Sequence, residues 1–281
     1  MLGDGLRLVT LPADRDPAHA PTTSAFVPAG AHGDATPLFA LPGFGLDGRS
    51  FEPLAPLAAA RRVVFWNPPN RLPPVATLDD FARLALEHAD RAGCDGPLIL
   101  LGASFGGLVA LAAALLEPQR VAGLVLVGTT AAWADVALPV RLAAALHGFV
   151  PPRLYHRVLP RVLVPQVSSD PGGGVNGALR TQMAHRTKAF GTAVVGALRR
   201  SGDLRPRLRD VRQPALVVHG AKDPAIPPRA ARTLARLPSS RVILLDDAAH
   251  LPFLSHPRAC LDALEPFLAE VDAHAGGRRR P

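Results

Sequence analysis

A Gly-x-Ser-x-Gly turn between an apolar run and a helix-forming run constrains this chain more than any other feature. Residues 102–107 read Gly-Ala-Ser-Phe-Gly-Gly, after the apolar run 97–101 and before the helix-forming run 108–117. In a tight turn from a strand to a helix, the backbone of the central residue, Ser104, is strained. The glycines of the turn let the strand and the helix pack closely. We expect its hydroxyl to project at a helix N-terminus, where free N–H groups can meet a developing negative charge. The pattern alone also fits an ordinary glycine-rich turn.

Length and composition favour one large α/β domain with an insertion. The chain has 281 residues, of which 48% are hydrophobic, and no apolar stretch reaches the ~18 residues that span a bilayer. Residues 1–11 lack the pattern of a secretory signal. Cys94 and Cys260 are expected to be free thiols, and neither has metal-site spacing. We therefore expect a cytoplasmic protein without a membrane span or a metal.

The formal charge of +8 is unevenly distributed. Residues 131–213 hold 13 Lys and Arg against 4 Asp, a net of +9, and the rest of the chain holds 18 against 19. A basic segment can attract an acidic acyl carrier protein, a coenzyme A ester or a carboxylate substrate. Arginine on a solvated surface is the simpler explanation. Nucleic-acid binding is not expected, because no recognised binding motif accompanies the charge.

Strand-like and helix-like runs alternate along most of the chain. The expected strands lie at 37–41, 62–67, 97–101, 121–127, 214–220 and 241–245, with expected helices at 49–60, 77–92, 105–117, 228–237 and 256–273. Thr77 and Asp80 form the pattern of a capping box. Such alternation predicts a mostly parallel sheet with crossover helices on its faces. The core is assigned to residues 1–130 and 210–275, followed by a disordered tail, 276–281.

Residues 131–209 interrupt the alternation with helical pieces broken by proline and glycine. So long an excursion is typical of a functional insertion, and we interpret it as a helical lid. Its large apolar side chains are candidate walls of an acyl pocket, although each could equally hold the lid together. The candidates are Trp133, Phe149, Tyr155 and Phe190, together with Leu154 and Val194.

Four motifs stand in an order that resembles the α/β-hydrolase superfamily. They are Pro-Gly-Phe-Gly at 42–45, the serine turn, Gly-Ala-Lys-Asp-Pro-Ala-Ile-Pro at 220–227 and Ala-Ala-His-Leu-Pro at 248–252. The similarity extends from about residue 38 to residue 268. It implies an α/β-hydrolase fold with Ser104 as nucleophile, Asp223 as acid and His250 as base. It also assigns the oxyanion donors to the backbone N–H groups of Phe44 and Phe105.

The implied chemistry explains these residue types. A serine hydroxyl is a weak nucleophile, so His250 must accept its proton and return it to the leaving group. Asp223 would orient the imidazole and stabilise its charged form. The alternatives are His256 as base and Asp135, Asp246 or Asp247 as acid. His219, at the end of a buried strand, is interpreted as a packed core histidine.

Two loops depart from the pattern of many relatives. Leu-Pro-Gly at 41–43 replaces the common His-Gly, as in some thioesterase-like members, and Trp-Asn-Pro-Pro-Asn-Arg at 66–71 replaces a glycine-rich loop. We expect a hydrolase that cleaves a carboxylic ester or thioester through an acyl-serine, without a cofactor, and that resembles carrier-protein methyl ester esterases and editing thioesterases. An acyltransferase, or a small-molecule receptor with little turnover, is the alternative.

Overall fold

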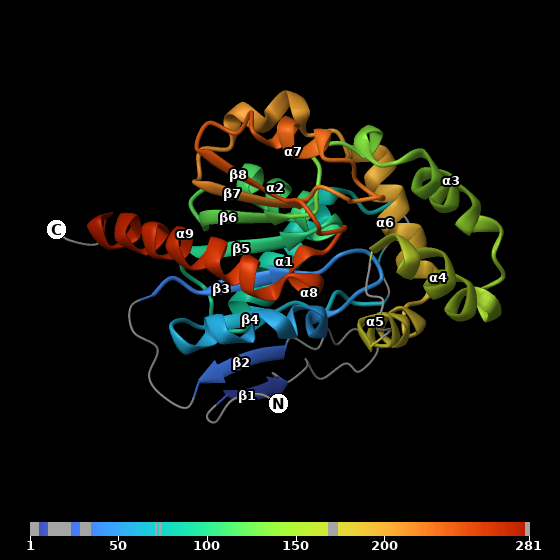
Figure 1. Ribbon diagram of the computed structural model, residues 1–281, viewed down its shortest axis with the longest axis horizontal. Helices are drawn as coiled ribbons and strands as arrows, with labels where there is room; N and C mark the ends of the chain where they lie inside the picture. The colour runs from blue at the N-terminus through green and yellow to red at the C-terminus, as the bar shows by residue number, and fades with distance from the viewer. Residues whose placement is uncertain are drawn as a thin grey trace.

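An eight-stranded sheet forms the centre of the molecule. The computed structural model describes residues 6–10, 24–28, 35–70, 72, 75–167 and 174–278. Within them the strand order is β1-β2-β4-β3-β5-β6-β7-β8. The six strands from β4 to β8 run parallel, and β1 and β2 form an antiparallel edge against β4 (Figure 1). The predicted parallel core of an α/β-hydrolase fold is confirmed.

The six strands of the parallel core, β3 to β8, occur close to the expected ranges. The bounds of all the described strands are β1 Leu6–Thr10, β2 Ser24–Pro28, β3 Leu38–Leu41, β4 Val63–Phe65, β5 Leu98–Ala103, β6 Val121–Val127, β7 Ala215–Gly220 and β8 Ser240–Leu245. Strands β3 to β7 are buried almost throughout, which explains why they read as continuous apolar runs rather than alternating ones.

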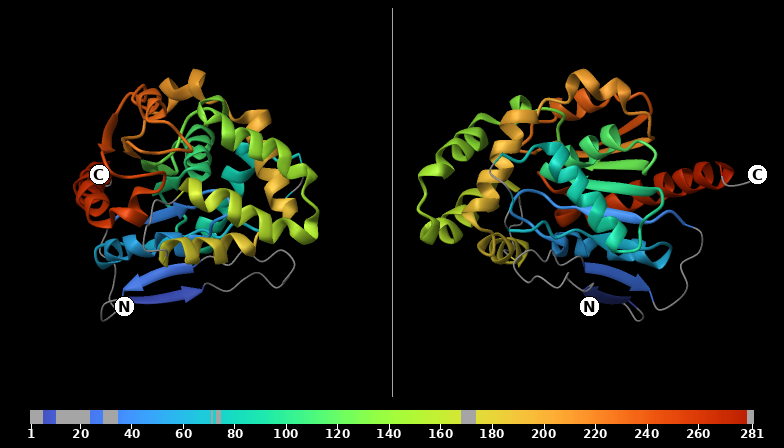
Figure 2. Two further views of the ribbon diagram at one scale, coloured as in Figure 1. Left: turned by 45° about the vertical axis from the view of Figure 1, so that its right-hand side comes forward. Right: turned by 180° about the vertical axis from the view of Figure 1, so that it is seen from behind.

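Each central strand sends alternate side chains into two core layers. In β5, Leu98 and Leu100 pack on one side, and Ile99 and Leu101 on the other. The first layer is covered by α1 (Leu78–Arg91), α2 (Phe105–Leu116) and α7 (Arg229–Leu234). The second is covered by η1 (Gly48–Ala59), α8 (Pro252–Ser255) and α9 (Pro257–Arg278). Figure 1 shows the face covered by α9, and the right view of Figure 2 shows the face covered by α1 and α2.

Some elements differ from their predicted form. The helix expected at 49–60 is a 3₁₀ helix with Pro53 and Pro56 inside it, two residues that cannot donate the backbone bonds of an α-helix. α9 continues to Arg278, past residue 276, where the disordered tail is expected to begin. The last residues of the chain, 279–281, lie outside the described part. The capping box of Thr77 and Asp80 at the start of α1 is confirmed.

The described part of segment 131–209, which is predicted to form a lid and is called the lid below, lies at the carboxyl ends of the parallel strands (Figures 1 and 2). It consists of η2 (Trp133–Asp135), α3 (Leu138–Leu146), η3 (His147–Phe149), α4 (Pro152–Val167), α5 (Gly174–Ala184), α6 (Lys188–Ser201) and η4 (Arg205–Asp210). Its two ends meet at a neck, where Trp133 N donates to Gly202 O at 2.6 Å and Leu204 N to Ala131 O at 2.7 Å. The neck carries the lid above the strand ends, where the loops with the predicted site residues converge.

Candidate active site

Ser104 occupies the turn between β5 and α2 in a strained conformation. Its φ of 51° makes it the one non-glycine residue with positive φ in the described part of the chain. The turn needs glycine beside it, because a Cβ on Gly106 would overlap the carbonyl oxygen of Leu41. The strain predicted from the Gly-x-Ser-x-Gly pattern is therefore present, and it lifts the hydroxyl clear of the sheet.

Neighbouring strand ends hold this turn in place. The N–H of Ser104 donates to Val127 O at 2.9 Å, and Thr129 Oγ1 donates to Ser104 O at 2.6 Å. Thr129 directly follows the positive-φ residue Gly128 after β6. The role of Thr129 was not predicted from the sequence, although a glycine followed by a hydroxyl residue at a strand end was a usable signal.

The three predicted polar side chains lie in one hydrogen-bonded line. Ser104 Oγ is 2.9 Å from His250 Nε2, and His250 Nδ1 is 2.8 Å from Asp223 Oδ2. A carboxylate only accepts, so Nδ1 carries the imidazole proton and Nε2 is free to accept from the hydroxyl. Asp223 and His250 are both buried. The arrangement can move a proton from the serine to the imidazole.

A short turn fixes the carboxylate of Asp223. Its Oδ1 accepts from the N–H groups of Ala225 and Ile226, both at 2.8 Å. His219 lies behind it, with Nε2 at 2.8 Å from Ile226 O and 3.3 Å from Asp223 Oδ2. Burial lowers the pKa of His219, which keeps the imidazole neutral. His219 is buried, as its interpretation as a packed core residue predicts. Its contact with the turn that holds Asp223 was not predicted.

The alternative acids and base have other partners. Asp135 accepts from Thr130 Oγ1 at 3.0 Å, and Asp247 forms an exposed ion pair with Lys222 at 2.6 Å. His256 Nδ1 lies 2.8 Å from Ser255 Oγ. None of these three residues has a hydrogen bond to Ser104 or His250 within the described ranges.

Two backbone N–H groups next to Ser104 are free to bind an anion. Phe105 is the first residue of α2, and Phe44 lies in a turn closed by a bond from Leu46 N to Gly43 O at 3.1 Å. Neither N–H donates to an acceptor in the described part of the protein. A Cβ on Gly43 would lie 3.3 Å from Ser104 Cβ, so the turn passes directly over the serine. These are the requirements for a pair of oxyanion donors.

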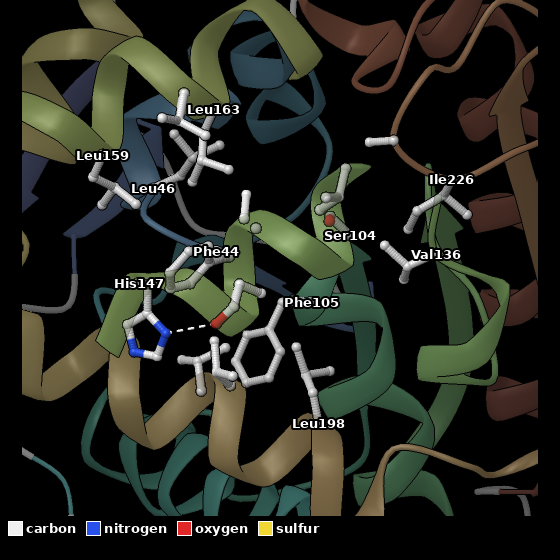
Figure 3. A pocket seen from close by; sticks show the side chains of 18 of the residues that line it. Phe44, Leu46, Ser104, Phe105, Val136, His147, Leu159, Leu163, Leu198 and Ile226 are labelled. Atoms are coloured by element: carbon white, nitrogen blue, oxygen red, sulfur yellow. Dashed lines mark hydrogen bonds between the residues drawn. The ribbon is translucent and has the colours of Figure 1, made fainter. Parts of the chain in front are cut away.

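An apolar cavity of about 330 Å³ extends from Ser104 into the lid (Figure 3). Figure 3 shows Leu159, Leu163, Val136 and Ile226 pointing toward this space with Phe44 and Phe105. Trp133, Tyr155 and Val194 also line the cavity, as predicted. Burial raises the pKa of Tyr155 to about 12, so its hydroxyl stays protonated. The aliphatic residues of α3 and α4 were missed, because their sequence pattern does not distinguish a cavity wall from a core.

Two aromatic candidates do not line this cavity. Phe149, at the end of η3, is 84% exposed, so the expectation that it forms a pocket wall is wrong. Phe190 is buried, but it packs behind the cavity wall, with its ring stacked on Phe44 at 6.1 Å between centroids. Leu154 is exposed on α4 and also lies off the cavity.

The described residues contain no cluster of three or more His, Cys, Asp or Glu side chains that could hold a metal ion. No helix in the same ranges is both long enough and apolar enough for a membrane span. Cys94 and Cys260 are both free and buried, and burial raises the pKa of each thiol. Neither thiol belongs to the serine site.

The sheet order, the strained serine turn and the acid–base line together define a hydrolase of the α/β class. Residues 38–263 match the alpha/beta hydrolase family, and the chain belongs to it. It is 37% identical over 182 residues to the pimeloyl-[acyl-carrier protein] methyl ester esterase of Aromatoleum aromaticum, covering 59% of this chain and 72% of that one. It is 32% identical over 252 residues to polyketide synthase ThaQ of Burkholderia thailandensis, covering 84% of this chain and 12% of that one.

A solved structure has a similar fold. The chain is similar to a malate-bound thermophilic esterase from Thermogutta terrifontis, with a TM-score of 0.77 and 22% identity. The match covers 95% of this chain and 99% of the other. At this level of identity the likeness concerns the fold alone.

Proposed function

We propose that this protein is a serine hydrolase that cleaves a carboxylic ester or thioester through an acyl-serine intermediate. The proposal rests on the line from Ser104 Oγ through His250 to Asp223, with distances of 2.9 and 2.8 Å. Membership of the alpha/beta hydrolase family and relatives named as esterases support it. In this proposal Ser104 is the nucleophile, His250 the general base and acid, and Asp223 the residue that orients the imidazole.

The reaction follows from this geometry in two halves. Ser104 Oγ bonds to the acyl carbon while its proton passes to His250 Nε2, and the N–H groups of Phe44 and Phe105 bind the oxyanion. Collapse breaks the bond to the alcohol or thiol, which takes the proton from His250. A water molecule then gives a proton to His250 and attacks the acyl-serine. Collapse breaks the bond between the acyl carbon and Ser104 Oγ, which takes the proton back from His250, and the carboxylic acid is released. No metal or cofactor is required by these steps.

The cavity and the charge of the lid support an acyl substrate on an acidic carrier. Apart from Ser104, His250, Thr130 and His147, the side chains of the cavity wall are aliphatic or aromatic, which suits an acyl chain. Arg153, Arg157 and Arg161 repeat every fourth residue along the exposed side of α4, with no ion pair to any described acid. We therefore propose an acyl carrier protein or a coenzyme A ester as the carrier, in line with the name of the Aromatoleum relative. The buried free thiols agree with our proposal that the protein is cytoplasmic.

Covalent labelling tests the nucleophile. The wild-type protein should react with a fluorophosphonate probe, and Ser104→Ala should not. Ser255→Ala is the matched control, because Ser255 is exposed and contacts His256 instead of His250. A folded wild-type protein that stays unlabelled, or equal labelling of Ser104→Ala, would overturn the proposal.

Turnover assays define the substrate. p-Nitrophenyl esters of increasing chain length are compared with matched thioesters, with Ser104→Ala as blank. Adding a competing alcohol or amine separates hydrolysis from acyl transfer, because transfer yields a new ester or amide in place of the acid. Slow turnover with tight retention of product would instead indicate a receptor.

The proposal of an acidic carrier is tested by varying the salt concentration and by removing positive charges from the lid. Turnover of acyl-carrier or coenzyme A esters should fall with rising salt, because exposed charges are screened beyond about 10 Å at 0.1 M. The triple variant Arg153→Gln, Arg157→Gln, Arg161→Gln should raise KM for these substrates but not for p-nitrophenyl esters. Arg232→Gln on α7 is the control, since Arg232 is exposed and lies outside the lid. Salt-independent turnover would contradict the carrier proposal.

A further inference from the structure

The turn between α5 and α6, residues 185–187, fastens the lid to two core loops beside the site. One is loop 42–47, which carries Phe44, and the other is loop 67–70 after β4. Figure 1 shows α5 and α6 in the lid, at the edge of the sheet where the parallel strands end. The segments meet only in the folded protein, because the turn follows loop 42–47 by about 140 residues in the chain.

Arg186 makes the central contacts of this turn. Its Nη1 donates to Pro68 O at 2.8 Å, and its Nη2 donates to Leu46 O over a short distance. The guanidinium also lies over the ring of Phe190, 4.9 Å from its centroid. Arg186 is 8% exposed and forms no ion pair with a carboxylate among the described residues.

Further hydrogen bonds join the lid to the same two loops. Gln182 Oε1 accepts from Asp47 N at 3.3 Å, so a second lid side chain holds loop 42–47. Thr187 Oγ1 donates to Asn70 O at 2.6 Å, and Asn70 Nδ2 donates to His185 O at 3.2 Å. Loop 67–70 is thus joined to the turn by three hydrogen bonds, and loop 42–47 is held by one bond from the turn and one from α5.

Two residues, Leu46 and Phe190, connect Arg186 to Phe44, the proposed oxyanion donor. Arg186 binds Leu46 O, and the N–H of Leu46 closes the turn around Phe44 by donating to Gly43 O at 3.1 Å. Phe190, which lies under the guanidinium, stacks on Phe44 with an interplanar angle of 10°. Backbone and ring of Phe44 are therefore both held by groups that contact Arg186.

A buried cation that forms no ion pair with a described residue joins two loops at a cost in free energy, because the nearby charge of Asp47 offsets only part of the effect of burial. Burial lowers the pKa of Arg186 to about 10, which reflects the cost of removing its charge from water. Apolar side chains of similar volume would join a lid to a core at no such cost. The planar fork of arginine, however, fixes two carbonyl groups at once and restricts their directions.

We infer that Arg186 is a positioning residue, which holds loop 42–47 so that the N–H of Phe44 points at the oxyanion formed on Ser104. The inference rests on the proposed function and adds that the lid sets the oxyanion geometry, besides walling the acyl cavity. A loop that relaxes without Arg186 would place the donor wrongly. Substrate binding should change less, because more of the cavity wall belongs to α3, α4 and α6 than to loop 42–47. Misplacement of such a group by about 1 Å can cost about 100-fold in rate.

The test compares Arg186→Met and Arg186→Lys with the wild-type protein, each normalised to active sites titrated with a phosphonate. Arg186→Met should lower kcat for a p-nitrophenyl ester by about 10-fold or more while KM changes less than about threefold. Arg186→Lys, which keeps one donor to a carbonyl, should recover part of the loss. If Arg186→Met does not fold, Arg186→Lys and Gln182→Leu carry the test, each with a smaller fall in kcat.

Arg61→Met is the matched control. Arg61 is also a buried arginine, but it pairs with Asp272 at 2.9 Å on the α9 side of the core. This control should lower Tm and leave kcat per active site unchanged. If the Arg186 variants behave like Arg61→Met, the inference is wrong although the proposed function stands. If the wild-type protein neither labels nor turns over esters, it is the proposed function that fails.

Discussion

The Nε2 nitrogen of His219 lies 2.8 Å from the carbonyl oxygen of Ile226 and thereby supports the turn that holds the proposed acid, Asp223. Because a carbonyl oxygen only accepts, Nε2 carries the hydrogen, and the neutral ring fits the lowering of its pKa by burial. Within the described residues, Nδ1 of the same ring has no hydrogen-bond partner. The ring thus contributes one donor, and it uses that donor on the turn 223–226.

Replacement of His219 by Leu should therefore reduce kcat for an ester substrate by about 10-fold, because a small displacement of the acid misdirects His250. His219→Gln, whose amide can still donate near this position, should lose less. The measurement is kcat and KM for both variants per titrated active site. Equal loss in both variants would show that volume, and not the hydrogen bond to Ile226, is what matters at this position.

His88 should make the stability of the protein depend on pH. Trp66 Nε1 donates to His88 Nδ1 at 2.6 Å in the core, and burial lowers the pKa of His88 to about 4. The unfolded chain, with a histidine pKa of about 6.5, binds this proton first as pH falls. The free energy of unfolding should drop by about 3 kcal/mol between pH 6.5 and 4, with no further loss from this group below pH 4.

Urea unfolding of the wild type and His88→Asn across this pH range checks the assignment. The asparagine can still accept from the indole but does not titrate, so its stability curve should be flatter. Identical slopes for the two proteins would place the pH dependence elsewhere.

Gly106→Ala should disturb the serine turn severely. The new Cβ would overlap Leu41 O and lie 2.8 Å from Pro42 O, so β3 and α2 would have to separate. We expect a loss of about 3 kcal/mol in the free energy of unfolding, with loss of fluorophosphonate labelling. Gly177→Ala is the control, because a Cβ in that place on α5 meets nothing within 4 Å. This control should stabilise the protein by about 0.5–1 kcal/mol, since alanine favours a helix more than glycine.

Ala144→Phe should shorten the accepted acyl chain. Ala144 lines the cavity from α3, whereas its neighbour Ala145 is exposed and does not. The larger side chain should lower kcat/KM for octanoyl esters by about 10-fold or more and leave acetyl esters within about twofold. Ala145→Phe should change neither. An unchanged chain-length profile in Ala144→Phe would mean that the acyl group does not enter this cavity.

Local signals in the sequence were sufficient for the parallel core and the serine turn. Buried strands such as β5 read as apolar runs ending in glycine or proline. The Gly-x-Ser-x-Gly spacing between a strand and a helix predicted the strained backbone of Ser104, whose φ is 51°. The roles of Asp223 and His250 were implied by the resemblance to α/β-hydrolases. Both residues follow strands, and parallel strands end at one edge of the sheet, so the two side chains can meet there.

Only the tertiary structure decided which lid residues face the site. Phe149 and Leu159 are both large apolar residues of helical segments, yet one is exposed to solvent and the other lines the cavity. The contacts of Arg186 join residues 118 and 140 positions apart, and no local pattern distinguishes this arginine from those on the lid surface. The sequence by itself thus determined the fold and the residues at its strand ends, because period and turn chemistry are local. Cavity walls and the lid contacts to loop 42–47 depend on how distant segments pack, which only the folded chain defines.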